Sequence, residues 1–275
     1  MRIQTRALSI VMLVVFLCIA AAFLFPFAWM ISSSFKEKSE IFANPPIWIP
    51  AKLHFENFTQ LFTEKNFGRV ILNSLFTAIT GTVGGLFFCS MAGFAFAKYN
   101  FRGKGLLFGL VLASLMIPME SSLVPLFVIY RDLGMIDQLW GVILPRLTSA
   151  FGIFYMRQYC MTIENELLEA SRIDGCSEAR IYFRIVAPIL IPAFASLGII
   201  FFVEEWNNFL WPTIILRSQE NLTLAVAIRA LQSGIRTPYN LIMSGSVISV
   251  VPMLLAIFIF QKQIIAGLTE GTLKG

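Results

Sequence analysis

The sequence predicts an all-α integral membrane protein with about six transmembrane helices. Hydrophobic residues make up 57% of the 275 residues and charged residues only 13%, whereas soluble domains carry roughly 25% charged residues. Apolar stretches of the length that a membrane helix needs, about 20 residues, recur along the chain. This composition excludes an ordinary soluble enzyme, a disordered chain and a secreted disulfide scaffold.

Six stretches with few charges are the predicted spans of one transmembrane domain, residues 1–275. The first is too long for the apolar region of a signal peptide, so we expect it to be retained. The second contains Gly81 and Gly85 on one helix face, which permits close helix packing. The third is interrupted by Pro118, and the fourth contains Arg146. The predicted spans are residues 7–31, 69–97, 105–130, 139–159, 185–216 and 239–262.

The segments between the spans differ in charge. Positive residues are densest in the short segments that lie on the same side of the membrane as the N-terminus. Segments rich in positive residues are usually cytoplasmic. This bias is slight; it favours an orientation with segment 160–184, the tail 263–275 and the N-terminus in the cytoplasm and segments 32–68 and 217–238 outside, and the family resemblance described below implies the same orientation. We attribute the net charge of +5 to cytoplasmic loops and their interaction with lipid headgroups, and not to binding of nucleic acid.

Known catalytic motifs are absent from the sequence. It contains no GxxxxGK[ST] phosphate loop, no HExxH, no GxSxG and no GxGxxG. The single histidine, His54, and four widely spaced cysteines give no basis for a metal site. We therefore expect no catalytic residues, no metal and no cofactor bound by this chain. Uphill transport would then take its energy from a gradient or a partner.

The charged segment 160–184 has the pattern of two short helices joined by a turn. Ala170 and Asp174 fall at helical spacing, and Gly175 can adopt the positive φ of a tight turn. Ser177 is placed to cap a second helix. The pattern predicts a rigid unit on the membrane surface. The alternative is a loop that only connects two spans.

The same segment resembles the EAA loop of the membrane subunits of bacterial ABC importers, which has the form E-A-A-x3-G-x9-I-x-L-P. Here Glu169-Ala170-Ser171 is followed after three residues by Gly175, and after nine more by Ile185-Val186-Ala187-Pro188. Two positions depart from the family form, both to small residues. By this resemblance the segment is a coupling helix that docks on an ATPase subunit. The implied coupling residues are Glu169, Ala170, Ser171, Asp174, Gly175, Ile185 and Pro188.

Other motifs are similar to the carbohydrate-uptake branch of this family, with a maltose-permease-like second subunit. They are Ser33-Ser34-Phe35-Lys36, Phe55-Glu56-Asn57-Phe58, Ala95-Phe96-Ala97, Phe101-Arg102-Gly103-Lys104, Ile117-Pro118, Pro125-Leu126, Trp206-Asn207 and residues 267–275. The resemblance implies the type I importer permease fold in the bacterial cytoplasmic (inner) membrane, with the coupling helix between spans four and five. It also implies a second permease subunit, an ATPase dimer that uses ATP and magnesium, an extracytoplasmic solute-binding protein, and a sugar or oligosaccharide moved by alternating access.

Polar residues within the spans are candidates for the transport path. An ionised carboxylate in lipid is costly, so Glu204 and Glu205 should face a cavity or a partner. One interpretation is that they line the path and hydrogen-bond sugar hydroxyls; the other is that they make structural contacts between helices. Glu120 is assigned to the path or to an ion pair with Arg146. The candidate path residues are Glu120, Glu204, Glu205, Trp206, Asn207 and Asn208.

A gradient-driven secondary transporter or channel is the alternative function. Glu204 and Glu205 would then act as a proton relay, and uptake would need no ATPase partner. The sequence shows no inverted repeat, which disfavours this alternative. A membrane enzyme is a third possibility, for which the sequence offers no site.

Overall fold

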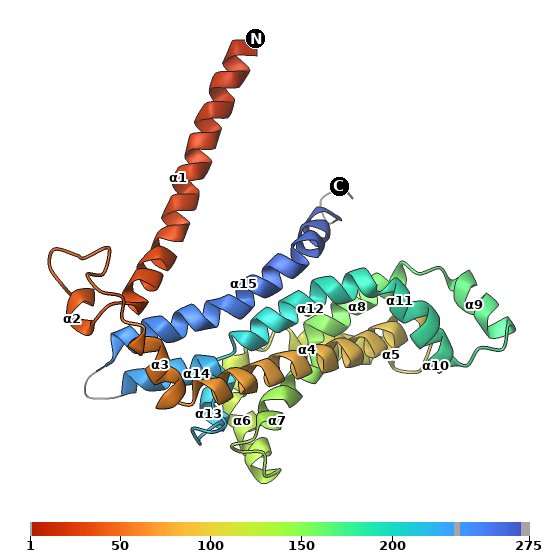
Figure 1. The fold of residues 1–275 in the computed structure, drawn as a ribbon. Coiled ribbons are helices and arrows are strands. Elements are labelled where there is room, and N and C mark those ends of the chain that lie inside the picture. Colours follow the sequence, from red (N-terminus) through yellow and green to blue (C-terminus); the bar gives the residue numbers. More distant parts are fainter. Residues whose placement is uncertain (1, 234–236, 271–275) are drawn as a thin grey trace. The chain divides into compact units, whose positions relative to one another are not determined.

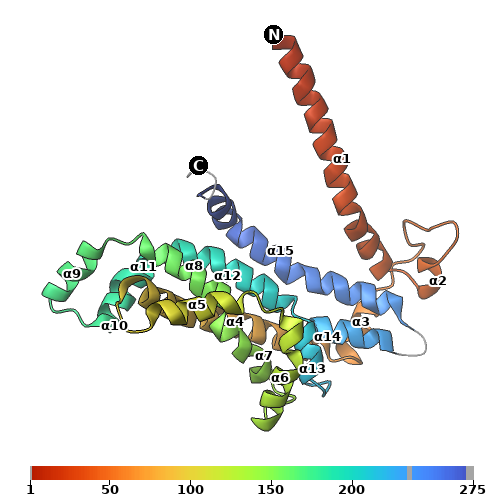
Figure 2. The same ribbon diagram turned by 180° about the vertical axis from the view of Figure 1, so that it is seen from behind.

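The computed structural model describes residues 2–233 and 237–270, and the regular structure in them is helical (Figure 1, Figure 2). The α-helices are α1 (Arg2–Ser34), α2 (Lys38–Ile41), α3 (Glu56–Thr63), α4 (Phe67–Lys98), α5 (Lys104–Ser114), α6 (Met119–Asp132), α7 (Leu139–Ile143), α8 (Ala150–Met161), α9 (Asn165–Ile173), α10 (Glu178–Ile181), α11 (Ala187–Ile189), α12 (Ile191–Trp206), α13 (Leu210–Ile215), α14 (Leu224–Ala230) and α15 (Tyr239–Glu270). Tighter 3₁₀ turns span Leu144–Thr148 and Leu231–Ser233, and a wider π-helical turn spans Tyr182–Val186.

Long apolar helices match the predicted fold class. Within the described residues, four stretches are long and apolar enough to cross a membrane: Val11–Ser34, Phe67–Lys98, Leu139–Met161 and Tyr239–Gln261. Two further stretches qualify only as bent pairs, Lys104–Ser114 with Met119–Asp132 and Glu178–Ile189 with Ile191–Ile215. Counting each bent pair as one span gives up to six, as expected for an all-α membrane protein of this kind.

The third predicted span, 105–130, is broken into two helices that meet at an angle of 106°. α5 ends at Ser114, and α6 begins at Met119, directly after Pro118. Proline lacks an N–H group and disfavours helical conformation in the residue before it, here Ile117. The interruption predicted at Pro118 is therefore a sharp bend.

The fifth predicted span bends at Leu190, two residues beyond Pro188. The helices before and after this point differ in direction by 76°. Pro192 lies in the first turn of α12. Its ring would clash with the carbonyl group four residues earlier in a continuous helix. Pro188 itself is accommodated inside helical structure, directly after the π-helical turn Tyr182–Val186, because that turn relaxes the hydrogen-bond ladder.

The chain divides into two compact units, which are described separately. The first consists of Met1–Gly68 with Ile228–Pro252, and the second of Arg69–Ala227 with Met253–Gly275. The first contains α1 to α3 and the beginning of α15. The second contains α4 to α13 and the segments proposed from the sequence as functional.

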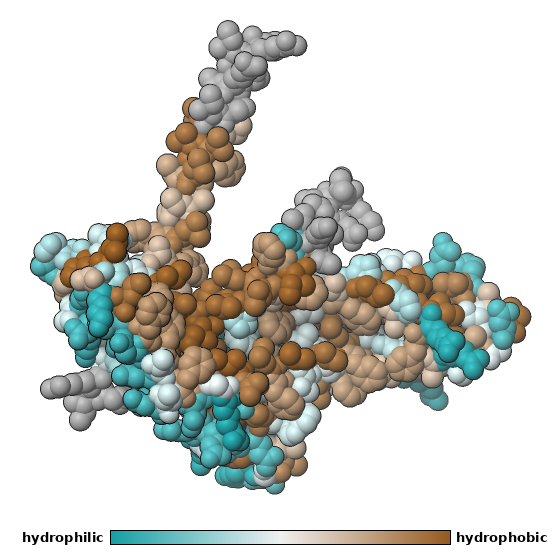
Figure 3. All heavy atoms as spheres, in the orientation of Figure 1, coloured by the Kyte–Doolittle hydropathy of each residue, from teal (hydrophilic) through white to brown (hydrophobic). Residues whose placement is uncertain are grey.

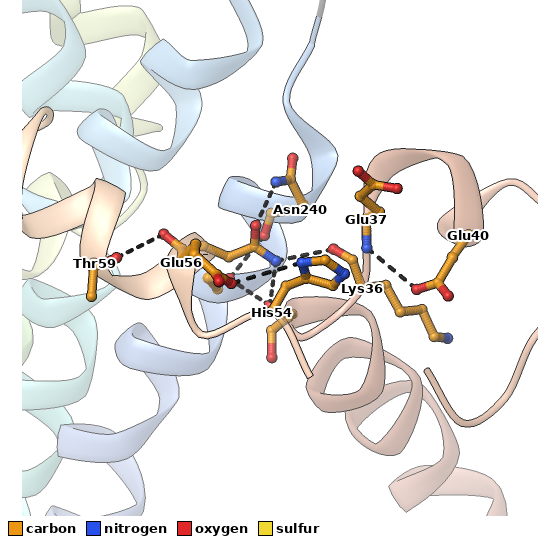
Figure 4. Close-up of polar contacts among 10 residues, drawn as sticks. Lys36, Glu37, Glu40, His54, Glu56, Thr59 and Asn240 are labelled. Atoms are coloured by element: carbon orange, nitrogen blue, oxygen red, sulfur yellow. Dashed lines mark hydrogen bonds and ion pairs between the residues drawn. The ribbon is translucent and has the colours of Figure 1, made fainter. Parts of the chain in front are cut away.

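Asn57 organises the polar interior of the first unit. Its side-chain amide donates to the carbonyl oxygens of Ser34, at 2.9 Å, and Lys36, at 3.0 Å. It also accepts from Asn240 at 2.7 Å, and Ser244 donates to the Ser34 carbonyl at 3.0 Å. These bonds satisfy the carbonyl groups at the end of α1, which have no partner within that helix. Part of the network is shown in Figure 4.

Two glycines permit close helix packing in the second unit. A Cβ atom on Gly85 would lie 3.0 Å from the Phe201 ring and 3.1 Å from the carbonyl oxygen of Arg146. At Gly93 it would lie 2.7 Å from the backbone nitrogen of Arg157. α4 therefore packs backbone to backbone against α8, as the small residues of this span predicted. The core between α4, α8 and α12 contains Cys89, Met156, Ala193, Leu197 and Phe201.

Candidate functional site

Segment 160–184 folds as helix, glycine turn and helix, as its pattern predicts. α9 ends at Ile173 with Asp174 as its C-cap, and Gly175 has a φ of +79°. The N–H of Cys176 donates to the carbonyl of Ser171, and that of Gly175 to Arg172, both at 3.0 Å. This pair of bonds is a Schellman motif, which favours glycine because side chains destabilise positive φ. α10 is capped by Ser177, whose side chain accepts from the N–H of Arg180 at 3.4 Å.

The inner face of this helical unit is fixed to the ends of the membrane helices. Leu168 of α9 and Ile181 of α10 are buried against Phe94 of α4 and Cys160 of α8. The hydroxyl of Tyr182 lies 2.6 Å from that of Ser90 on α4. Figure 1 shows α9 and α10 together beyond one end of α4, α8 and α12. Because the unit packs into a continuous core, it can move only together with these helices.

A polar brace adds to this packing. Glu178 accepts a hydrogen bond from Tyr99, which directly follows α4, and a charged one from Arg172 at 2.8 Å. The Arg172 and Tyr99 hydrogen bonds hold the pKa of the Glu178 carboxyl below its ordinary value. On the other side, Lys98 donates to the Ile163 carbonyl and, at 2.9 Å, to the side chain of Asn165. Both braces join the end of α4 to the helical unit.

The outer face of the same unit is exposed. Glu169, Ala170, Asp174 and Gly175, four of the predicted coupling residues, lie on the surface. Ile173 is 87% exposed beside them. Figure 3 shows hydrophilic residues over the end of the molecule where α9 and α10 lie, with hydrophobic ones between them. An apolar side chain surrounded by charges is typical of a protein-binding surface.

The other three predicted coupling residues lie elsewhere. Ser171 is buried, and its hydroxyl donates to the carbonyl of Leu167 at 2.7 Å. A small side chain is needed there, since α9 packs on the core at this face. Ile185 is half-buried against the core cluster that contains Leu168, and Pro188 is exposed in α11. Ser171 and Ile185 hold the unit on the core, whereas the exposed residues of α9 and its turn can contact another protein.

A second candidate site lies between α7 and α12. A cavity of about 320 Å³ is lined by Met119, Val142, Pro145, Arg146, Glu204, Glu205, Asn208 and Trp211. Arg146 lies in the 3₁₀ turn that divides the fourth predicted span. Its guanidinium group is 2.6 Å from Glu204 and 3.6 Å from Glu205, and it lies over the Phe201 ring. Arg146 is therefore paired with the two glutamates of the fifth span, and not with Glu120, which is exposed.

The two glutamates differ in their surroundings. The Glu205 side chain is 3% exposed, and the Glu204 side chain is 53% exposed. The amide of Asn208 lies 3.5 Å from one oxygen of Glu205. The other Glu205 oxygen is buried and has no hydrogen-bond partner among the described residues. An unsatisfied buried oxygen beside a cavity can accept a hydrogen bond from a hydroxyl group or from water.

The remaining candidate path residues do not line this cavity. Trp206 is 3% exposed and stacks on Phe202. The Asn207 amide donates to the carbonyl of Val203 at 2.9 Å, back along its own helix. Trp211 lines the cavity instead, with its indole N–H bonded to the carbonyl of Gly141 at 2.9 Å.

The sequence offered no signal for two of these pairings. Tyr99 and Glu178 are 79 positions apart, and Arg146 and Glu204 are 58 apart. A single charged residue among apolar ones shows that a partner is required, but not which one. No group of three or more His, Cys, Asp and Glu side chains that could hold a metal ion occurs in the described parts of the chain.

The apolar helices, bent and straight, define a multi-pass membrane protein. The rigid helical unit 160–184, with its exposed face, is suited to contact another protein. Residues 85–269 match the family of binding-protein-dependent transport system inner membrane components. The chain belongs to this family, and it is accordingly a multi-pass permease of the inner membrane.

Curated relatives match over nearly the whole chain. It is 38% identical to the arabinooligosaccharides transport system permease protein AraQ of Bacillus subtilis (strain 168), over 99% of this chain and 98% of AraQ. It is 32% identical to the lactose transport system permease protein LacG of Rhizobium radiobacter, over 90% and 91% of the two chains. These relatives are transport permeases.

The fold is also similar to a solved structure. A chain of a bacterial ABC transporter involved in the import of the acidic polysaccharide alginate superposes with a TM-score of 0.82. The match covers 94% of this chain and 97% of the other, at 23% identity. The described helices therefore have the architecture of an ABC importer permease.

Proposed function

We propose that this chain is one of two non-identical permease subunits of an ATP-driven, binding-protein-dependent importer of a sugar or oligosaccharide. The observation that carries the proposal is the exposed face of α9 and its glycine turn, held rigidly to α4 and α8. The sugar substrate is inferred from the relatives, whose names specify arabinooligosaccharides and lactose. The chain itself is assigned no catalytic role.

In this proposal a separate ATPase dimer binds ATP and magnesium, and this chain binds no cofactor. Closure of the ATPase dimer would move the helical unit 160–184 as a rigid body. The braces to Tyr99 and Lys98 would transmit that movement to α4. The membrane helices would then change from inward-open to outward-open, which is alternating access.

The proposal also sets the orientation. The helical unit 160–184, hereafter the coupling unit, lies in the cytoplasm, together with the N-terminus and the tail 263–275. Residues 271–275 of that tail lie outside the described part of the chain. Segments 32–68 and 217–238 are then on the other side of the membrane, where the solute-binding protein would dock. The start of the second segment is held in place by Asp137, whose carboxylate accepts from the N–H groups of Arg217, at 2.9 Å, and Ser218, at 3.0 Å.

We assign the sugar contacts in this subunit to Glu204, Glu205 and Asn208. They line the cavity, and one Glu205 oxygen has no hydrogen-bond partner in the part of the chain that the structure describes. A sugar hydroxyl can donate to that oxygen and accept from the guanidinium group of Arg146. Trp206, Asn207 and Glu120 were candidates for the same path, but they do not line the cavity, so the proposal gives them no sugar contact.

The test compares two glycine variants in the intact complex. Gly175 and Gly134 both have positive φ and open space around the missing Cβ. Aspartate at either position causes similar backbone strain, but only Gly175 lies on the proposed coupling surface. We expect Gly175→Asp to abolish sugar uptake while ATP hydrolysis continues or the ATPase dissociates, and Gly134→Asp to retain uptake. Normal uptake by Gly175→Asp would contradict the coupling role.

A secondary transporter is favoured by one observation, the buried carboxylate of Glu205 beside Glu204. In that case uptake would be abolished by an uncoupler and would need no ATPase. Uptake by the purified chain alone, driven by a proton gradient in vesicles, would decide for this function. Uptake that requires ATP and a co-purifying ATPase would exclude it.

A further inference from the structure

The segment after α2 folds back along the end of α1 (Figure 1). The Trp48 ring packs edge-on against Phe25, at 5.4 Å, and against Trp29, at 5.1 Å. Its carbonyl oxygen accepts a hydrogen bond from Ser32. Phe25, Trp29 and Ser32 are separated by four and three positions, so they share one face of the helix. Trp48 is therefore fixed to α1 at a known height.

That height can be placed relative to the bilayer. The candidate span in α1, Val11–Ser34, has 24 residues and a length of about 36 Å. The apolar core of a bilayer is about 30 Å thick. Phe25 lies nine residues before the end of this span, about 14 Å along the helix axis. The contacts with Phe25 and Trp29 therefore hold Trp48 below the end of the span, near the boundary between lipid tails and headgroups.

The same segment exposes large hydrophobic side chains. Ile49 is 83% exposed, Phe42 62%, Trp48 54% and Leu53 52%. Two exposed lysines accompany this group: Lys38 precedes it in sequence, and Lys52 lies directly before Leu53. Exposure of four large apolar residues to water would be unfavourable, because transfer of apolar surface out of water lowers the free energy. Tryptophan prefers the membrane interface, and lysine can extend its amino group towards headgroup phosphates.

We propose that residues 42–53 form an interfacial anchor, which inserts Trp48 and Ile49 into the headgroup region of the leaflet in which α1 ends. The occupant of this surface is lipid, because the segment continues the exposed apolar surface of α1 at membrane depth. Part of the segment 32–68, which we assigned to the solute-binding protein, would then face the bilayer instead. The anchor would fix the height and rotation of α1 in the membrane.

The test is the collision rate of a nitroxide spin label with oxygen, which concentrates in lipid, and with a water-soluble nickel complex. Labels are placed singly at Ile49→Cys, at Phe16→Cys in the exposed middle of α1, and at Glu64→Cys, an exposed polar position of the same unit. The full complex is used in phospholipid nanodiscs. Cys18 and Cys176 are first replaced by serine, whereas Cys89 and Cys160 are fully buried.

We expect the ratio of the oxygen to the nickel collision rate for the label at position 49 to be shifted towards the ratio at position 16 and away from the ratio at position 64. Adding Trp48→Ala should shift the Ile49 ratio back towards the Glu64 value, because the packing on α1 is lost. A ratio equal to that at Glu64 would overturn the proposal. So would protection of Ile49 from both reagents, which would indicate a protein partner, or an Ile49 ratio unchanged by Trp48→Ala.

Discussion

At the residue scale, the buried charges of the membrane helices are tolerated because they are paired with one another. Arg146 is 15% exposed and Glu205 is 3% exposed, so each depends on the other for compensation of its charge. Removing only one partner of a buried ion pair is costly, because the other charge is left in a low-dielectric environment without compensation. The same geometry leaves one Glu205 oxygen without a hydrogen-bond partner in residues 2–233 and 237–270, which makes this cluster a candidate for ligand contact as well as for stability.

Arg146→Met is expected to destabilise the chain by about 3–5 kcal/mol, because it leaves Glu205 buried without a counter-charge. The double variant Arg146→Met/Glu205→Gln should recover part of this loss. Thermal unfolding in detergent, followed by circular dichroism, measures the effect. Glu204→Gln is the matched control, since its half-exposed side chain should contribute at most about 1 kcal/mol. Equal losses for Arg146→Met and Glu204→Gln would contradict the buried pairing.

Glu205→Ala tests whether the same carboxylate contacts substrate. Loss of the free acceptor oxygen should lower sugar uptake while ATPase association is kept. Uptake by reconstituted complexes and ATPase co-purification give the two readouts. Normal uptake by this variant would remove Glu205 from the path and leave the cluster a purely structural role.

The coupling unit shows at the element scale how two short helices become rigid. α9 and α10 are too short to be stable alone. The Schellman turn at Gly175, burial of Leu168 and Ile181, and the brace to Tyr99 compensate for this. Most of the local structure could be predicted from the sequence, because glycine and the Ser177 cap act on near neighbours. The brace to Tyr99 could not, since it depends on tertiary packing.

The brace should weaken at low pH. Hydrogen bonds from Arg172 and Tyr99 lower the pKa of Glu178 in the folded state. A lowered pKa contributes stability that is present above the ordinary carboxyl pKa and is lost as the pH falls through the lowered folded value. Amide hydrogen exchange in 165–181 should therefore accelerate under acidic conditions below the ordinary range of glutamate. Because Glu178 is half-exposed, the effect should be small.

Arg172→Gln should reproduce that acceleration at neutral pH, because it removes the main partner of Glu178. Arg180→Gln is the matched control: it removes the same charge from an exposed position of α10. The measurement is again hydrogen exchange of the amides in 165–181. Similar exchange rates in both variants would show that net charge, and not the brace, is responsible.

At the scale of the whole molecule, the all-α membrane class could be predicted from apolar length, and the described residues contain four spans, or up to six if each bent pair is one span. The bends could be placed only in part. Pro118 marked the break between α5 and α6, but the bend near Pro188 is set by Pro192 and by the π-helical turn before it. Local rules identify prolines that interrupt a helix, whereas packing decides which of two nearby prolines bends it.

Assembly with an ATPase is the central claim of the proposed function. It is tested most directly by purifying the tagged chain in a mild detergent, as wild type and as Ile173→Asp. Ile173 is 87% exposed on α9, so the variant should fold normally. Leu133→Asp, an equally apolar exposed position in another segment, is the control. We predict that an ATPase with a phosphate-loop motif and a second permease co-purify with wild type and Leu133→Asp, and that the ATPase is lost from Ile173→Asp. A wild-type chain that purifies alone and still transports would contradict the account.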